Sequence, residues 1–170
     1  MKLSDIRSSW RIGFNWAIIK FSTILPPGRF KNWLLRRTGA DIHKDAWISP
    51  DVIIDPVFPE LITITDNAFI GWGTKLFTHM ITPRWEIIKE PIIVDGFVGG
   101  DCTIEPGCKI YGILGAHSYL RRGKIIQRGQ YWYGIPAHPK DDTDMKEFDE
   151  FIKLEMEMLN RIEGIHEEKS

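Results

Sequence analysis

Histidines are the side chains of this sequence best placed to carry chemistry. An imidazole, whose unperturbed pKa is about 6.5, can accept a proton at neutral pH or bind a metal ion. The chain has five of them: His43, His79, His117, His138 and His166. Their chemistry depends on where the fold places them, so the elements that carry them must be found first.

The two cysteines, Cys102 and Cys108, lie six residues apart and could be mistaken for a redox or metal-binding pair. Two cysteines in 170 residues form no disulfide framework, and this spacing is not typical of a metal site. We therefore expect a reducing compartment, and we expect the chain to be cytoplasmic.

A six-residue repeat organises the middle of the chain. Aliphatic residues recur in three sets: Ile42, Ile48 and Ile54; Ile64, Ile70 and Leu76; and Ile92, Val98, Ile104 and Ile110, closed by Ala116. A period of six matches neither the 3.6 of an α-helix nor the 2 of an ordinary strand.

Small residues follow the same period four positions behind the aliphatic ones: Ala46, Val52, Ala68, Thr74, Gly96, Cys102 and Cys108. A triangular coil explains both series, because each face is then one short strand with an aliphatic residue pointing inward and a small residue near the corner. The sequence therefore predicts an all-β solenoid, a parallel β-helix. In it the cysteines are small interior residues, since free cysteine behaves as a small hydrophobe.

Two interruptions of the repeat predict loops that leave the coil. Residues 55–60 contain two prolines, and residues 77–91 form a longer excursion that contains His79. Loops that project from a rigid solenoid commonly carry function.

The sequence resembles the hexapeptide-repeat acyltransferases, in particular their maltose/galactoside and xenobiotic acetyltransferase branches, from about Asn32 to Pro139. The motifs that carry the resemblance occur in the family's order: Ile70-Gly71, His79 in a loop, Phe97-Val98-Gly99, Pro106-Gly107 and Gly134-Ile135-Pro136-Ala137. The resemblance implies a left-handed parallel β-helix that assembles as a homotrimer with active sites between subunits.

By this resemblance His79 is the general base of an acetyl transfer from acetyl coenzyme A to a hydroxyl or amine of a small acceptor, such as a sugar. General base catalysis contributes roughly 10²–10⁴-fold. A backbone N–H of Gly99 or Gly100 would stabilise the oxyanion that forms on the thioester. Coenzyme A is a co-substrate in this reaction, and no metal is expected.

Counting without gaps from Phe97 to Gly134 places the expected coenzyme A contacts at Gly99, Gly100, Ser118 and Lys124. The Lys124 ammonium would bind a phosphate, in a local excess of positive charge from Arg121, Arg122 and Arg128. A solvated basic turn is the alternative.

Arg84, Trp85 and Phe97 are the residues expected to form the acceptor pocket. Trp85 could stack on a sugar ring and Arg84 could pair with an anion. Trp85 could instead pack the loop against the coil.

Two other functions are compatible with this sequence. One is a β-helix scaffold without catalytic activity, favoured by Gly73, which stands where many members of the family have asparagine. The other is a γ-class carbonic anhydrase, which needs three histidines around one zinc. The histidines available in the coil are His43, His79 and His117.

The chain divides into an N-terminal basic helical segment (1–38), the β-helix domain (39–139) and an acidic C-terminal helix (140–170). Residues 1–40 contain eight Lys or Arg and one acid, whereas residues 141–170 contain eleven acids and four bases. The N-terminal segment predicts two helices divided by Pro26-Pro27-Gly28, which either cap the open end of the coil or lie on a membrane surface through residues 5–37. The C-terminal helix is expected over Asp144–Glu163 and could pack against the basic segment.

Opposite charges balance over the whole chain, whose formal net charge is −1. A dedicated nucleic-acid-binding protein would show a clear basic excess, so we expect no nucleic-acid partner.

Overall fold

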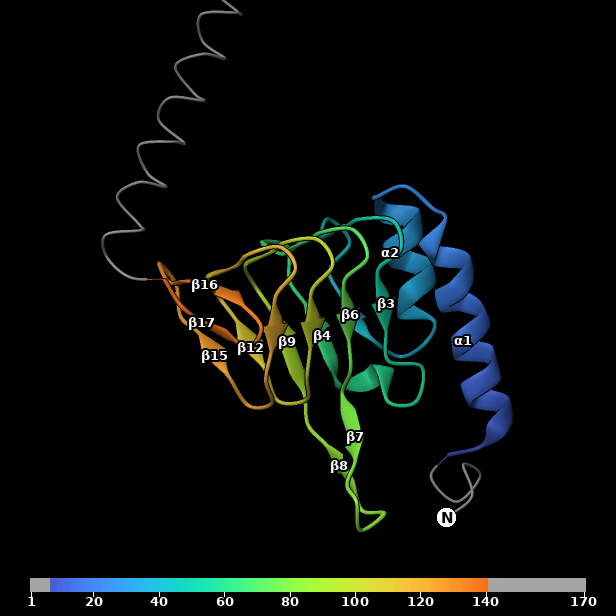
Figure 1. Cartoon of the computed structure of the whole chain (residues 1–170). Coiled ribbons are helices and arrows are strands. Elements are labelled where there is room, and N and C mark those ends of the chain that lie inside the picture. Colours follow the sequence, from blue (N-terminus) through green and yellow to red (C-terminus); the bar gives the residue numbers. More distant parts are fainter. Residues whose placement is uncertain (1–6, 141–170) are drawn as a thin grey trace, which may run out of the picture. The chain divides into compact units, whose positions relative to one another are not determined.

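The computed structural model describes residues 7–140, most of which form a coil of very short strands (Figure 1). The chain visits three sheets in turn, so each coil contributes one strand to each sheet, and strands of successive coils pair in parallel. This is the left-handed parallel β-helix that the repeat and the resemblance predict.

We call the three sheets the first, second and third faces. The first contains β1 (Asp41–Ile42), β4 (Ile62–Ile64), β9 (Ile92–Val94), β12 (Lys109–Ile110) and β15 (Ile125–Ile126). The second contains β2 (Trp47–Ile48), β5 (Phe69–Ile70), β10 (Phe97–Val98), β13 (Ile113–Leu114) and β16 (Tyr131–Gly134), with β17 (Ala137–Pro139) paired antiparallel to β16. The third contains β3 (Ile53–Ile54), β6 (Lys75–Leu76), β11 (Thr103–Ile104) and β14 (Tyr119–Leu120). The first, second and third corners follow the faces of the same number.

The core is a stack of aliphatic side chains inside the coil. Ile48, Ile70 and Val98 are fully buried in register on the second face, and Ile54, Leu76 and Ile104 are fully buried on the third. Burying one such side chain contributes about 1.5–3 kcal/mol. The two-residue strands are stable because every coil adds to this common core.

Both cysteines lie in the interior, as predicted. Cys102 and Cys108 are almost completely buried and are free thiols. Burial raises the pKa of the Cys102 thiol and raises that of Cys108 to about 11. A raised pKa keeps both thiols protonated at neutral pH, which makes them poor nucleophiles.

In the third set of the predicted repeat Val98, Ile104 and Ile110 are fully buried as expected, but the two ends of the set are out of phase. Ile64 aligns with Val94, not Ile92, and the interior residue after Ile110 is Leu114, because Ala116 is exposed. The first corner is two residues shorter in these coils and contains Gly96 or Gly112. A Cβ on Gly96 would lie 2.3 Å from the Gly112 carbonyl oxygen, so the shorter corner requires glycine.

The second corner contains a left-handed backbone residue in each of four successive coils. These are Asp51, Gly73, Asp101 and His117, with φ between 53° and 73°. Asparagine, aspartate and glycine are the residues that adopt this conformation most readily. Gly73 therefore makes the same turn as Asp51 and Asp101, so glycine at this position does not by itself indicate a degenerate protein.

Two helices cover the end of the coil at β1, α1 (Ser9–Thr23) and α2 (Arg29–Arg36), on either side of Pro26-Pro27-Gly28 as predicted (Figure 1). Asn32 is fully buried, and its Nδ2 donates hydrogen bonds to the carbonyl oxygens of His43, Lys44 and Ala46 at 3.2, 3.1 and 2.8 Å. The Nζ of Lys31 donates to Ser49 O at 2.7 Å. The capping interpretation of this segment is confirmed by these contacts.

Lys31 is also buried, at 1% exposure, and burial lowers its pKa to about 8 although Asp51 partly opposes the shift. A short 3₁₀ helix, η2 (Pro59–Leu61), follows the first proline-containing loop. The helix expected over Asp144–Glu163 lies outside the described residues.

Substitution of Asn32 by alanine should lower the free energy of unfolding by about 1–3 kcal/mol, because three carbonyl groups lose a buried donor. Urea denaturation of the full chain measures the effect. Arg29→Ala, on the same helix, removes an exposed ion pair with Asp45 and should leave the midpoint close to that of the unchanged protein. Equal midpoints for both variants would contradict the capping role of Asn32.

Candidate active site

His79 lies on a β-hairpin that projects from the third corner of the second coil (Figure 1). The expected loop 77–91 is largely this hairpin, formed by β7 (His79–Ile81) and β8 (Ile87–Lys89) in antiparallel register. The turn between them is closed by a hydrogen bond from Trp85 N to Thr82 O at 2.9 Å. His79 is therefore held at the base of the hairpin, where it leaves the rigid coil.

Asp55 is the partner of His79. It follows β3 directly and is fully buried, and its Oδ2 contacts the Nδ1 of His79. The same oxygen accepts hydrogen bonds from the Thr78 backbone N–H at 3.0 Å and hydroxyl at 2.8 Å, while Oδ1 accepts one from Val57 N–H at 2.8 Å. The carboxylate is thus fixed on several sides and cannot turn away from the imidazole.

The Asp55 carboxyl is ionised at neutral pH. Burial alone would raise its pKa, but the hydrogen bonds and charge of His79, with the bonds from Val57 and Thr78, outweigh burial and lower it. A carboxylate at Nδ1 selects the tautomer that carries its proton there and leaves Nε2 free to accept a proton. Phe58 packs edge-on against the imidazole at 5.5 Å, and the His79 side chain remains 22% exposed.

Sequence analysis did not identify Asp55 as a functional residue. The signal was present, because Asp55 follows the interior residue Ile54, and Ile54 pairs with Leu76 just before the His79 excursion. With coils aligned in this register, an acid after Ile54 lies beneath the start of the hairpin. The two interruptions of the repeat lie at the same corner of consecutive coils, and this relation brings Asp55 next to His79.

Lys124 lies at the third corner, the same corner as His79, two coils further on. It is exposed and makes no ion pair within residues 7–140, whereas two arginines of the basic run are paired. Arg122 pairs with Glu90, with Nε 3.1 Å from Oε1, and Arg128 pairs with Asp95 at 2.9 Å. The positive charge left for an anion is therefore concentrated at Lys124 and Arg121.

The other residues expected to contact coenzyme A lie at the second corner, one face away from His79. The Gly99 N–H donates to Leu114 O at 2.8 Å, and a Cβ on Gly99 would lie 2.4 Å from Ala116 N. Gly99 is thus explained by the close stacking of coils, and its N–H is not free. Gly100 N–H has no partner in the described part of the chain, so of the two N–H groups it is the one available to a ligand.

The Ser118 side chain points into the coil. It is 2% exposed, and its Oγ accepts a hydrogen bond from Gly134 N–H at 3.1 Å. A contact from Ser118 to a bound molecule would therefore come from its main chain.

The expected acceptor residues are not brought together within one chain. Arg84 and Trp85 lie at the hairpin tip, and Trp85 is 71% exposed, so it does not pack the hairpin against the coil. Phe97 lies on the outer surface of the second face, stacked on Phe69 with ring centroids 4.7 Å apart, and Phe69 stacks in turn on Trp47.

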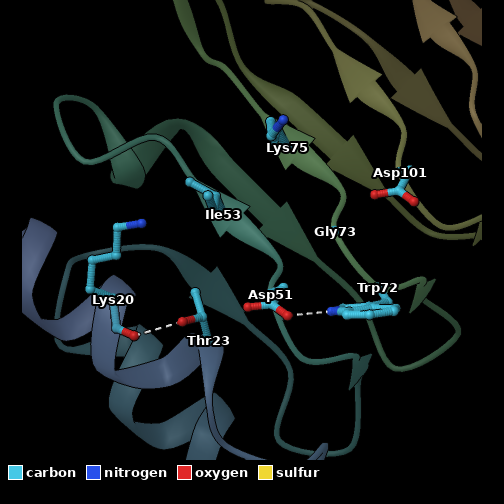
Figure 2. A pocket seen from close by; sticks show the side chains of 8 residues that line it. All are labelled: Lys20, Thr23, Asp51, Ile53, Trp72, Gly73, Lys75 and Asp101. Carbon is cyan, nitrogen blue, oxygen red and sulfur yellow. Dashed lines mark hydrogen bonds between the residues drawn. The ribbon is translucent and has the colours of Figure 1, made fainter.

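A cavity of about 320 Å³ lies beside the second corner (Figure 2). The Trp72 indole N–H donates to Asp51, which leaves the ring exposed, and Asp101 and Lys75 face the same space. Ile53, Gly73 and, from α1, Lys20 and Thr23 complete the lining. His117 lies at the same second corner, with its Nδ1 3.9 Å from Asp101 Oδ2, so His117 and His79 lie at different corners.

Known proteins with similar sequences include several named as putative acetyltransferases. The chain is 29% identical over 102 residues to the putative acetyltransferase YvoF of Bacillus subtilis, covering 56% of this chain and 57% of YvoF. It is 33% identical over 66 residues to the putative acetyltransferase SAS0727 of Staphylococcus aureus, covering 38% and 41%. The chain spans about half the length of these curated relatives. No protein-family model matches it.

Solved structures with a similar fold include the hexapeptide-repeat acetyltransferase VCA0836 of Vibrio cholerae with acetyl coenzyme A, at a TM-score of 0.58 and 19% identity over 79% of this chain and 87% of that one. A maltose O-acetyltransferase of Clostridium difficile aligns at a TM-score of 0.53 and 12% identity, over 78% and 86%. A galactoside acetyltransferase in complex with coenzyme A gives 0.52 and 16%, over 78% and 80%. The chain therefore has the left-handed β-helix fold of these acetyltransferases.

Proposed function

We propose that this protein transfers an acetyl group from acetyl coenzyme A to a hydroxyl or amine of a small acceptor. The observation that carries the proposal is the Asp55–His79 pair, a buried carboxylate fixed against a partly exposed imidazole at the base of a projecting hairpin. The names of the similar proteins support the same reaction.

His79 would act through Nε2, because Nδ1 is held by Asp55. Nε2 accepts the proton of the acceptor while the acceptor oxygen or nitrogen attacks the thioester carbonyl carbon. The carbon–sulfur bond then breaks, and the proton on Nε2 passes to the leaving thiolate. The imidazole returns to its starting state, so no covalent enzyme intermediate is needed.

Asp55 would act as a positioning residue in this reaction. Its charge keeps the His79 ring in one tautomer and stabilises the imidazolium that forms during transfer. It is fully buried, so it would act through His79 and not by touching the substrates.

Coenzyme A would bind between two coils, with the Lys124 ammonium of one chain on a phosphate and the Gly100 N–H of a second copy at the thioester oxygen. The exposure of Lys124 and its lack of an ion pair among the described residues support this placement. A contact with Ser118 would come from the main chain. The role of Gly99 would be to allow successive coils to pack closely.

The active site would be completed by a second copy of the chain in a homotrimer. His79 lies at the third corner, whereas Gly100 lies at the second corner and Phe97 on the second face. Within a single chain the proposed base is therefore apart from the proposed thioester site. A neighbouring subunit that brings its second corner to the His79 hairpin would unite them. Arg84, Trp85 and the neighbour's Phe97 would then line the acceptor pocket.

Acyl transfer is better supported than zinc chemistry. In the proposed trimer His79 could meet a neighbour's His117, but His43 lies at the first corner, so three histidines would not converge on one zinc ion. Within residues 7–140 of one chain there is no group of three or more side chains suited to a metal ion. The fixed Asp55–His79 pair also favours an active enzyme over a scaffold, since a scaffold has no need of an oriented imidazole. The free buried thiols favour a reducing, cytoplasmic location.

Loss of the His79 imidazole should lower kcat by about 10²–10⁴-fold while acetyl coenzyme A binding is retained. Thiol release with a panel of sugar and amine acceptors measures the rate, and calorimetry measures binding. His43→Ala, an exposed histidine at the first corner, is the matched control and should keep the rate. Unchanged turnover in His79→Ala would contradict the proposed base.

Removal of the Lys124 charge in Lys124→Ala should weaken acetyl coenzyme A binding by about tenfold, because a charge-assisted contact with a phosphate is lost. Lys44→Ala, which removes an exposed lysine of the first coil, should not change the affinity. If the unchanged protein does not bind acetyl coenzyme A at millimolar concentration, the scaffold alternative holds.

Substitution of Asp55 by asparagine should lower the free energy of unfolding by roughly 2–4 kcal/mol at neutral pH, because the hydrogen bonds to a buried charge are lost. The folded-state pKa of Asp55 is lowered, so its charge stabilises the protein above the unfolded value of about 3.9, and this stabilisation is lost as the pH falls through the folded pKa. The difference between the two proteins should therefore shrink below about pH 4. Urea denaturation at several pH values measures it.

Asp66→Asn, at an exposed corner position, is the control and should leave the midpoint at neutral pH unchanged. If the effect of Asp55→Asn did not change with pH, its carboxylate charge would not be the stabilising feature.

A further inference from the structure

Helix α1 has apolar residues where a surface helix normally has polar ones. Its buried residues are Asn15, Ile19, Ser22 and Thr23, two of which, Asn15 and Ser22, are fully inaccessible. Its exposed stripe contains large apolar side chains: Trp10 at 82%, Phe14, Phe21 and, just beyond the helix, Ile24 at 74%. A helix that is apolar on its outward side typically binds a partner through that side.

Helix α2 presents aromatic and basic side chains outward. Phe30 and Trp33 are exposed and stacked, with ring centroids 6.0 Å apart, and the Arg37 guanidinium lies 4.5 Å from the Trp33 ring centroid. The buried side of the same helix holds Lys31, Asn32 and Leu35 against the coil. Capping therefore uses one side of each helix and leaves the aromatic side without a function in the coil.

We call the exposed side chains of both helices the cap surface: Trp10, Phe14, Trp16, Lys20, Phe21, Ile24, Phe30, Trp33 and Arg37. The two helices pack against each other at the same end of the coil (Figure 1). Tryptophan and phenylalanine mixed with lysine and arginine are typical of segments that lie at a membrane interface.

The charge of the cap surface favours an anionic partner. Residues 7–40 contain no aspartate or glutamate. Lys20 and Arg37 make no ion pair with any described residue, whereas the bordering carboxylates Asp45 and Glu60 are paired with Arg29 and Arg7. Asp51 and Asp101 line the same cavity as Lys20 (Figure 2). Asp51 is hydrogen bonded to Trp72, and Asp101 Oδ2 lies 3.9 Å from His117 Nδ1.

We propose that the cap surface binds the surface of an anionic lipid bilayer, with α1 and α2 lying in the interface. The aromatic side chains enter the headgroup region, and Lys20 and Arg37 bind lipid phosphates. A helix of 15 residues is too short to cross a bilayer, and no described helix is long and apolar enough to do so. This binding does not depend on the proposed acetyl transfer.

A second copy of the chain is the competing occupant. The cap surface carries positive charge without acids, so two copies joined through it would bring like charges together. An anionic bilayer satisfies both the apolar and the cationic side chains, which is why we favour it.

Vesicle co-sedimentation of the full chain tests the proposal, using phosphatidylcholine vesicles with or without phosphatidylglycerol. The protein should bind the vesicles that contain phosphatidylglycerol and bind much less to phosphatidylcholine alone. The variant Trp10→Gln/Phe14→Gln/Phe21→Gln should bind the phosphatidylglycerol vesicles at least about tenfold more weakly than the unchanged protein, because apolar contact area is lost. Glutamine keeps helix propensity, and circular dichroism confirms that the variant is folded.

Two further variants keep the test decisive if that one is unstable. Lys20→Gln/Arg37→Gln changes only exposed charges and should reduce binding to the level seen with phosphatidylcholine. Trp85→Gln removes an equally exposed aromatic side chain at the hairpin tip and should bind as the unchanged protein does.

Three results would overturn the proposal. They are absence of binding to vesicles that contain phosphatidylglycerol, equal binding to both vesicle types, and full binding by the charge variant. A cap-surface variant that abolishes self-association in sedimentation velocity, with no change in vesicle binding, would assign the surface to contacts between copies.

Discussion

Pairing of each coil with the next is the constraint on which the rest of this structure depends. Strands of two residues have no independent stability, and they persist because every coil hydrogen-bonds to its neighbours. Along the second face, Trp47 N–H donates to Ala68 O at 3.0 Å, Phe69 N–H to Gly96 O at 3.1 Å and Phe97 N–H to Gly112 O at 3.0 Å.

The first coil has no coil before it, so its outer backbone groups need other partners. Nitrogen donors of the cap, including those of Asn32, Lys31 and Arg36, bind its carbonyl oxygens. Part of the basic character of the N-terminal segment is therefore a requirement of the fold.

The same constraint decides where chemistry can be placed. The faces must stay in register, but a corner can lengthen because its residues need not pair with every coil. The third corner lengthens in two consecutive coils, first at Asp55 and then at the His79 hairpin. The register of β3 and β6 brings these excursions together, so the carboxylate and the imidazole meet although they are 24 residues apart. A rigid coil thus holds the pair, and the hairpin beyond it is free to vary in sequence.

The fold could be predicted from the sequence because its core residues repeat every six positions, and Ile48, Ile54, Ile70 and Leu76 are buried as expected. The prediction missed the step from Val94 to Val98, which spans four residues and passes through Gly96. This shorter step also keeps the coil closed, and a search for a period of six does not detect it. His79 could be selected because the interruption of the repeat marks its loop. Asp55 could not, because its role depends on pairing between coils and not on its neighbours in the sequence. The contacts of Asn32 were hidden for the same reason.

The cap has to meet two demands, and only one of them comes from the coil. Closing the first coil requires donors and a few apolar side chains, and Asn15, Ile19, Lys31, Asn32 and Leu35 supply these on the inward sides of the helices. If capping were the only role of the helices, polar residues would stabilise the outward sides equally well and would keep the protein more soluble. The outward sides carry Trp10, Phe21 and Trp33 instead. Their exposure costs solubility and adds nothing to the closure of the coil, so the composition of this surface is explained by a partner outside the chain.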